Sequence, residues 1–211
     1  LKNLDAAYQN FFRSKEVGYP KFKSKKNRHR SYKTNYTNNN IAFVDGKIKL
    51  PKIGKVKFRD KQIPQGRIIS ATISQTPSGK YFVSICCTEV EKPAFIRTDK
   101  YVGIDLGIKD FVITSDGNKY NNHRYLQKSL SKLAKLQREL SRKTKGSSNW
   151  DKARIKVARL QEKIVNQRKD RLNKLSTELI RNYDVICLEY LQIKNMVKNH
   201  KLAQAISDAS W

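Results

Sequence analysis

The stretch YVGIDLG at Tyr101–Gly107 decides the fold, because it places a carboxylate inside a strand-forming pattern. Alternate residues of a strand share a face, so Val102 and Ile104 lie on one face and Asp105 lies on the other. A carboxylate in the middle of an apolar strand is costly unless it is paired or binds a metal. Glycines two residues to either side leave room beside the carboxylate for hydrated ions and a phosphate backbone. The segment therefore predicts a strand that presents Asp105 as a metal ligand.

A second apolar segment, DVICLE at Asp184–Glu189, also ends in a carboxylate. Three short strands are predicted before it, at Tyr101–Leu106, Phe111–Thr114 and Lys119–Tyr120. Two long helices separate these strands from the segment at 184–189. This order is typical of a ribonuclease-H-like α/β layer, in which the first and fourth strands lie side by side. Asp105 and Glu189 are then expected at one sheet edge, where they could hold two Mg²⁺ ions for phosphodiester cleavage.

Two other interpretations of these carboxylates stay open. Each could instead form a structural ion pair with one of the many Lys and Arg side chains. The letters GIDLG also resemble the first phosphate loop of actin-type and Hsp70-type ATPases. That loop continues with small hydroxyl residues, whereas this chain continues Ile108-Lys109-Asp110 and has no second Gly-rich phosphate loop.

The charge of the chain indicates an anionic partner. Its 211 residues include 45 Lys and Arg against 18 Asp and Glu, a net charge of +27. Nucleic acid is the first expectation, because cations neutralise phosphates and release counterions. A membrane surface would need one amphipathic basic helix, whereas this charge is spread along the chain. No signal peptide and no apolar run long enough to cross a membrane is recognised, so a cytoplasmic, nucleoid-associated protein is expected.

Cations and aromatic rings alternate over residues 18–40, a pattern that suits phosphates and bases together. A solvated loop anchored by its rings is the alternative. The two predicted helices also have faces dense in Lys and Arg, for which a bare coiled-coil spacer is the alternative. The candidate nucleic-acid contacts are Lys21, Lys23, Lys25, Lys26, Arg28, Arg30, Tyr32 and Lys33, followed on the helices by Arg142, Lys143, Lys145, Arg168 and Lys169.

Three segments are predicted along the chain. Residues 1–16 have the pattern of the end of a helical region. Residues 17–98 hold short strands with turn signals at Asp45-Gly46 and Pro77–Gly79, which predicts a small antiparallel β-barrel. Residues 99–211 form the α/β domain, with a helical hairpin at 123–182. Three cysteines lie in apolar runs, without zinc-site spacing, and are expected to be buried reduced thiols: Cys86, Cys87 and Cys187.

Five segments, in order, resemble one family. They are GYPKFKSKKN (18–27), YVGIDLGIKDFVITSDG (101–117), LSRKTKGS (140–147), NQRKD (166–170) and DVICLEYLQIKNMVKNHKLAQAISDASW (184–211). The family is the TnpB (OrfB) group of insertion-sequence proteins, relatives of the type V CRISPR effector nucleases. The resemblance implies a wedge-like barrel that holds a guide RNA and a RuvC-like nuclease domain, with Asp105 and Glu189 as the first two catalytic carboxylates.

The same resemblance implies an RNA-guided, Mg²⁺-dependent DNA endonuclease of transposon origin, described as a transposase or its accessory. Its partners would be guide RNA and target DNA, with no membrane and no small-molecule substrate. Residues 1–16 match only the end of the family's N-terminal helical region, and its zinc ribbon and third catalytic Asp have no counterpart among these residues. The chain is therefore expected to be an internal fragment, or the product of a decayed or split gene, that is inactive alone, with zinc only in the missing ribbon. Asp208 falls inside the ISDASW motif and is not expected to replace the third Asp.

Overall fold

The computed structural model describes residues 2–21, 30–60, 62–91 and 94–209 of the chain. Two compact units emerge from the contacts between residues. The first comprises Leu1–Thr76 and Lys80–Thr88, and the second comprises Pro77–Gly79 and Glu89–Trp211. Each unit has a hydrophobic core of its own.

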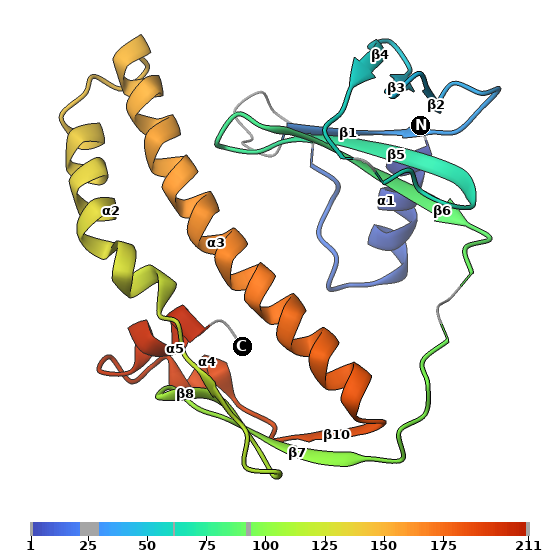
Figure 1. Ribbon diagram of the computed structural model, residues 1–211. Helices are drawn as coiled ribbons and strands as arrows, with labels where there is room; N and C mark the ends of the chain where they lie inside the picture. Colours follow the sequence, from blue (N-terminus) through green and yellow to red (C-terminus); the bar gives the residue numbers. More distant parts are fainter. Residues whose placement is uncertain (1, 22–29, 61, 92–93, 210–211) are drawn as a thin grey trace. The chain divides into compact units, whose positions relative to one another are not determined.

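The described residues of the first unit form one helix and two small antiparallel sheets (Figure 1). Its elements are α1 (Lys2–Arg13), β1 (Arg30–Asn35), β2 (Ala42–Val44), β3 (Lys47–Leu50), β4 (Gly54–Lys57), β5 (Arg67–Gln75) and β6 (Tyr81–Thr88). One sheet has the strand order β1-β5-β6 and the other has the order β2-β3-β4. The core between them contains Ile41, Ile48 and Leu50 packed with Ala71 and Ile73 of β5.

The prediction of a closed β-barrel is wrong for the residues that the structure describes. Strands β1 and β6 are the edges of one sheet and β2 and β4 are the edges of the other, so no ladder joins the sheets into a ring. The apolar residues are buried by packing one sheet face on the other, which needs no closure. The two predicted hairpins are confirmed, with turns at Asp45-Gly46 and between Gln75 and Tyr81.

Strand β1 lies within the basic, aromatic segment at 18–40, where no strand was predicted. Its register with β5 runs from Arg30↔Gln75 to Asn35↔Ser70. The alternation of Tyr32 and Thr34 with polar residues was the available signal, because β-branched and aromatic residues favour strands. The many Lys and Arg residues in this segment made the alternation difficult to recognise as a strand pattern.

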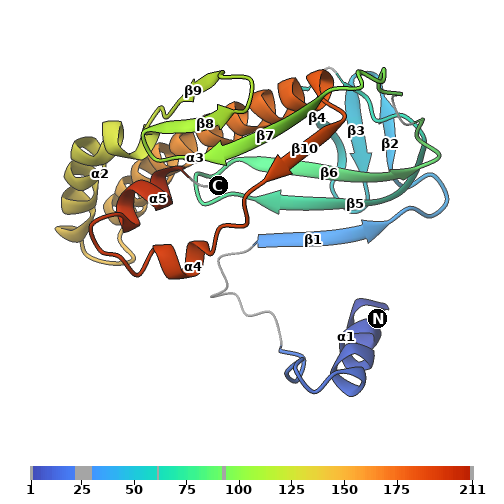
Figure 2. The same cartoon turned by 90° about the horizontal axis from the view of Figure 1, so that it is seen from below.

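The second unit has one four-stranded sheet and a long helical hairpin (Figure 2). Its elements are β7 (Tyr101–Leu106), β8 (Asp110–Thr114), β9 (Lys119–Asn121), α2 (Tyr125–Ser141), α3 (Ser148–Asn182), β10 (Val185–Leu188), α4 (Ile193–Met196) and α5 (Ala203–Ala209). The strand order is β10-β7-β8-β9, with β10 parallel to β7 and the other pairs antiparallel. The prediction that the first and fourth strands are neighbours is confirmed.

Helix α3 covers one face of this sheet. Leu175 and Leu179 pack against Val102 and Ile104 of β7 and against Val112 of β8. The helix begins where Ser147 caps it, with the Ser147 Oγ accepting a hydrogen bond from the Trp150 N–H at 3.1 Å. The predicted break between the two helices is therefore confirmed. The opposite face of the sheet holds the residues that alternate with this core, among them Asp105.

The prediction of buried thiols is wrong, because Cys87 is half-buried and the other two cysteines are exposed. Cys187 is exposed because it pairs with Gly103 on the sheet face away from α3, and Cys86 is exposed on an edge strand. Within the described part of the chain, no helix is long and apolar enough to span a membrane.

Candidate functional site

Asp105 lies on β7, and Glu189 comes directly after β10, the strand that pairs with β7. The parallel register pairs Leu188 with Ile104, so Asp105 is the next residue on β7 and Glu189 is the first residue after β10. Ile104 is 6% exposed and belongs to the core, which puts Asp105 on the opposite, solvent-facing side. Two carboxylates 84 positions apart in the chain are thus brought to the same end of one parallel strand pair.

Both carboxylates are exposed, and neither forms an ion pair or a hydrogen bond with another described residue. The interpretation of Asp105 and Glu189 as structural ion pairs is therefore not supported by the described part of the chain. Their donor set suits Mg²⁺, which binds through one or two carboxylates and keeps several waters. No group of three or more His, Cys, Asp or Glu side chains suited to a metal occurs among the described residues.

Gly107 has a structural role in the turn after Asp105. A Cβ atom at this position would lie 2.6 Å from the Asp110 carbonyl oxygen, closer than side chains approach backbone. The Gly107 N–H also donates to the Phe111 carbonyl at 3.3 Å. A Cβ at Gly103, by contrast, would make only ordinary contact with Ser115 at 3.7 Å. Gly107 is thus required by the β7–β8 turn, whereas Gly103 is compatible with the predicted open space.

Asp184 fixes the register that brings the two carboxylates together. Its side chain accepts hydrogen bonds from the Thr98 N–H at 3.0 Å and the Asp99 N–H at 2.6 Å. In return, the Asp184 N–H donates to the Lys100 carbonyl at 3.0 Å. A slip of one residue would move every side chain of β10 to the other face. This contact at the start of both strands therefore determines where Glu189 lies, and sequence reasoning missed it.

Asp184→Ala is expected to loosen the start of β7 and β10. Desolvation alone would raise the pKa of the Asp184 carboxyl, but hydrogen bonds from Asp99 and Thr98 outweigh it and lower the pKa. The stabilisation is present above the ordinary carboxyl pKa of about 4 and is lost as the pH falls through the lower folded value. Hydrogen exchange should show faster exchange of the Thr98 and Asp99 amides in the variant at neutral pH. Unchanged exchange rates at both amides would contradict this role.

Asp208 connects three helices. Its carboxylate accepts hydrogen bonds from the backbone N–H groups of Leu126 and Gln127, each at 3.0 Å, in the first turn of α2. It also accepts a hydrogen bond from Arg168 Nη2 of α3 at 2.7 Å. The residue before α2, Arg124, has a φ of 47° and gives no side-chain cap, so Asp208 of α5 caps the helix instead.

Burial alone would raise the pKa of the Asp208 carboxyl, but hydrogen bonds from Arg168, Gln127 and Leu126 outweigh it and lower the pKa. The Arg168 side chain is only 18% exposed and is paired with this carboxylate. Arg168 therefore has a structural role, and its contact with nucleic acid stays a prediction. Burial and pairing could not be recognised from a Lys- and Arg-rich helix.

The other predicted nucleic-acid contacts divide into three groups. Lys23, Lys25, Lys26 and Arg28 lie outside the described residues. In the first unit, Lys21, Arg30, Tyr32 and Lys33 are exposed. In the second unit, Arg142, Lys143, Lys145 and Lys169 are exposed.

A basic groove of about 450 Å³ lies between the end of α2 and the start of α3. Its lining residues are Glu139, Arg142, Lys143, Asn149, Lys152, Ala153 and Lys156. Four cations against one acid make it suited to phosphate groups. Lys152 and Lys156 were missed by sequence reasoning, although their spacing of four residues places them on one helix face. Lys145 is exposed but does not line the groove.

Comparison with known proteins gives one family match and several relatives. Residues 84–200 match a family model, OrfB_IS605, described as a probable transposase. A Streptomyces pristinaespiralis protein named "Putative RNA-guided DNA endonuclease" is 40% identical over all of this chain and 52% of its own length. The Escherichia coli K12 protein "Putative RNA-guided DNA endonuclease InsQ" is 36% identical over 94% of this chain and 48% of its own length. The chain thus spans about half the length of these relatives.

Proposed function

Because the chain belongs to the OrfB/IS605 family of probable transposases, we propose that it is part of an RNA-guided, Mg²⁺-dependent DNA endonuclease. Asp105 and Glu189 are the carboxylates of the proposed active site. The observation that supports this best is the parallel register of β7 and β10, which brings two unpaired acids together on a strongly cationic chain. The strand order β10-β7-β8-β9 supports a ribonuclease-H-like, RuvC-type domain.

The proposed metal site depends on the exposure and lack of partners of the two carboxylates. Asp105 and Glu189 would each supply oxygen ligands, the chemistry that Mg²⁺ prefers. When bound, the metal would supply Lewis acidity to the scissile phosphate and lower the pKa of a bound water. The chain's own task is to keep both carboxylates at one end of the sheet, which the hydrogen bonds of Asp184 to Thr98 and Asp99 support.

The proposed nucleic-acid surfaces lie on both units. Residues 1–88 contain 19 Lys and Arg against 4 Asp and Glu, a net charge of +15. In the second unit, the basic groove adds Arg142, Lys143, Lys152 and Lys156. In this proposal base pairing by the guide RNA supplies the sequence recognition, and the protein supplies charge and shape.

Metal binding tests this proposal on the 211-residue chain itself. Mn²⁺, which accepts the same oxygen ligands, can be titrated and followed by electron paramagnetic resonance. Asp105→Asn and Glu189→Gln should each weaken Mn²⁺ binding by roughly 10- to 100-fold. Asp170→Asn is the matched control, since Asp170 is an exposed acid on α3 paired with Lys174. Equal Mn²⁺ affinity in all four proteins would refute the metal site.

A non-catalytic RNA- or DNA-binding module is the second candidate function. The proposed site has only the carboxylates of Asp105 and Glu189 among the described residues, and no group of three or more metal-binding side chains occurs among them, which favours this second candidate. In that case the chain would bind nucleic acid with a steep salt dependence. Mn²⁺ would then bind to the wild-type chain no more tightly than to the Asp105→Asn variant.

A further inference from the structure

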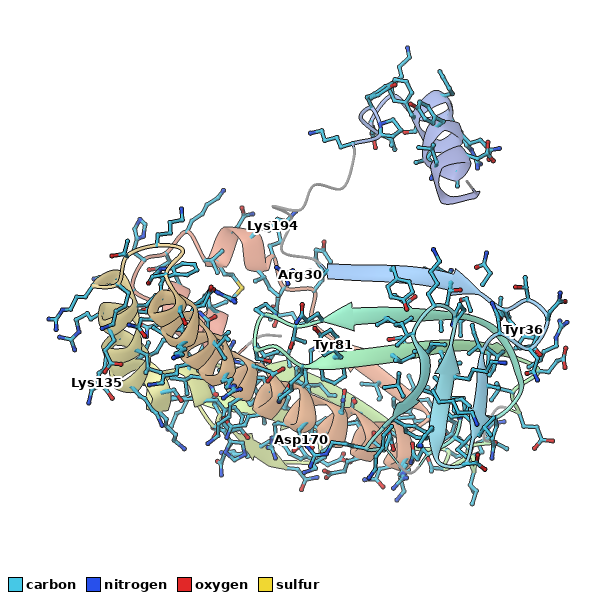
Figure 3. All side chains as sticks on the ribbon, turned by 90° about the horizontal axis from the view of Figure 1, so that it is seen from above. Arg30, Tyr36, Tyr81, Lys135, Asp170 and Lys194 are labelled. Atoms are coloured by element: carbon cyan, nitrogen blue, oxygen red, sulfur yellow. The ribbon has the colours of Figure 1, made fainter. Side chains whose placement is uncertain are left out.

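One end of the β1-β5-β6 sheet has a row of side chains that crosses all three strands. Arg30 begins β1, Gln75 ends β5 and Tyr81 begins β6, and the register pairs Arg30 with Gln75 and Gln75 with Tyr81. Figure 3 labels Arg30 and Tyr81, the first and last members of the row. Arg30 Nη1 donates to Gln75 Oε1 at 3.3 Å, and Gln75 Nε2 donates to the Tyr81 hydroxyl at 2.9 Å. Gln75 therefore holds the cation and the ring in place.

A second row on the same face lies two residues further along each strand. It consists of Tyr32, Ile73 and Val83, again in register. Ile73 belongs to the core between the two sheets and is 8% exposed, whereas Tyr32 is 42% and Tyr81 is 70% exposed, so the two tyrosines lie at the rim of that core. From ordinary strand spacing, the two tyrosines lie about 12 Å apart. That separation suits two different bases better than a single one.

These residue types match the needs of an unpaired nucleic-acid strand. An exposed ring on a sheet face can stack on a base, which contributes roughly 1–3 kcal/mol per base. Arg30 can neutralise a phosphate, and the amide of Gln75 can bond a base edge. In a duplex the base faces are already stacked on one another, so a stacking surface selects unpaired bases.

We propose that Tyr32 and Tyr81, with Arg30 and Gln75, form a base-stacking platform for an unpaired segment of RNA. This inference rests on the proposed function, in which an RNA remains bound to the protein while DNA targets change. The net charge of +15 over residues 1–88 complements the RNA backbone. Of the four residues, Gln75 and Tyr81 lie outside the basic, aromatic segment at 18–40.

The test is fluorescence anisotropy with the 211-residue chain and a fluorescein-labelled oligo(U) RNA of ten nucleotides. Tyr81→Ala and Tyr32→Ala should each weaken binding about 5- to 150-fold, the equivalent of losing one stacked base. Tyr81→Phe keeps the ring and should stay within about threefold of the wild type. Tyr81→Trp should bind oligo(U) with quenching of its indole fluorescence.

Phe82→Ala is the matched control, because Phe82 is an aromatic residue on the same strand, 50% exposed, and pairs with Ser74 on the opposite sheet face. It should bind oligo(U) as the wild type does. Binding of a ten-base-pair RNA duplex should be the same in Tyr81→Ala and the wild type. Equal oligo(U) affinity of Tyr81→Ala and the wild type, no quenching in Tyr81→Trp, or an effect on oligo(dT) alone would overturn the proposal. Failure of the wild-type chain to bind any RNA would instead refute the RNA part of the proposed function.

Discussion

Asp208→Ala is expected to lower the free energy of unfolding by about 2–4 kcal/mol. The substitution removes the acceptor of the Leu126 and Gln127 N–H groups, which begin α2. It also leaves the Arg168 guanidinium, 18% exposed, without its carboxylate. Loss of a helix cap and an uncompensated, largely buried charge are both costly, and total stabilities are only about 5–15 kcal/mol. Denaturant unfolding followed by the fluorescence of Trp150 on α3 measures the difference.

Two controls separate the cap from the charge. Asp208→Asn keeps an acceptor oxygen for α2 but loses the charge opposite Arg168, so an intermediate loss is expected. Asp170→Ala removes an exposed ion pair with Lys174 and should cost less than about 0.5 kcal/mol. Because the pKa of Asp208 is lowered in the folded protein, the advantage of wild type over Asp208→Asn should be full at neutral pH and shrink below about pH 4. A pH-independent difference would contradict this account.

Asp105→Asn is expected to reduce DNA cleavage by about 10³-fold or more in the complete reading frame that contains this chain. The loss follows from removal of one of the two carboxylates that the proposed Mg²⁺ site contains. Glu189→Gln should have a similar effect. The double variant should be scarcely worse than either single variant, because residues that act as one unit are not additive. Cleavage of a labelled target duplex in the presence of guide RNA and Mg²⁺ gives the rates.

In this experiment the Asp105→Asn substitution should lower the rate of DNA cleavage without changing the affinity of the protein for guide RNA. Asp105 is an acid and does not line the basic groove, so guide-RNA affinity should be unchanged in Asp105→Asn. Asp45→Asn, an exposed acid in the β2–β3 turn, is the control for loss of one negative charge. A cleavage rate of Asp105→Asn within a few-fold of the wild type would show that Asp105 is not a catalytic ligand.

Sequence patterns predicted the strands and helices of the second unit well, because the local sequence of each element favours the structure that it adopts. The alternation of apolar residues predicts the bounds of β7. The order of the strands along the chain predicts that the strands of Asp105 and Glu189 are neighbours in the sheet. Polar contacts between distant segments could not be predicted in this way. The Asp208 cap of α2 and the Asp184 contact with Thr98 join residues more than 80 positions apart, and no local pattern signals them.

The first unit shows the opposite limitation. Strand β1 was missed because its Lys, Arg and Tyr residues were interpreted as nucleic-acid contacts rather than as a strand pattern. Closure of a sheet into a barrel depends on pairing between its first and last strands, which turn signals do not specify. The cations were recognised by type, but only structure distinguishes the exposed Lys169 from the paired Arg168.

The parallel pairing of β7 with β10 has a consequence for the order of folding. Tyr101 and Val185 are partners 84 positions apart, whereas β2 and β3 are joined by a turn of two residues. Contacts between distant residues require closure of a long loop and form slowly, while local hairpins form within microseconds. During synthesis, the strands of the first unit are complete at residue 88, long before β10 emerges. The half of the chain proposed to hold RNA can therefore form while the two carboxylates are still apart.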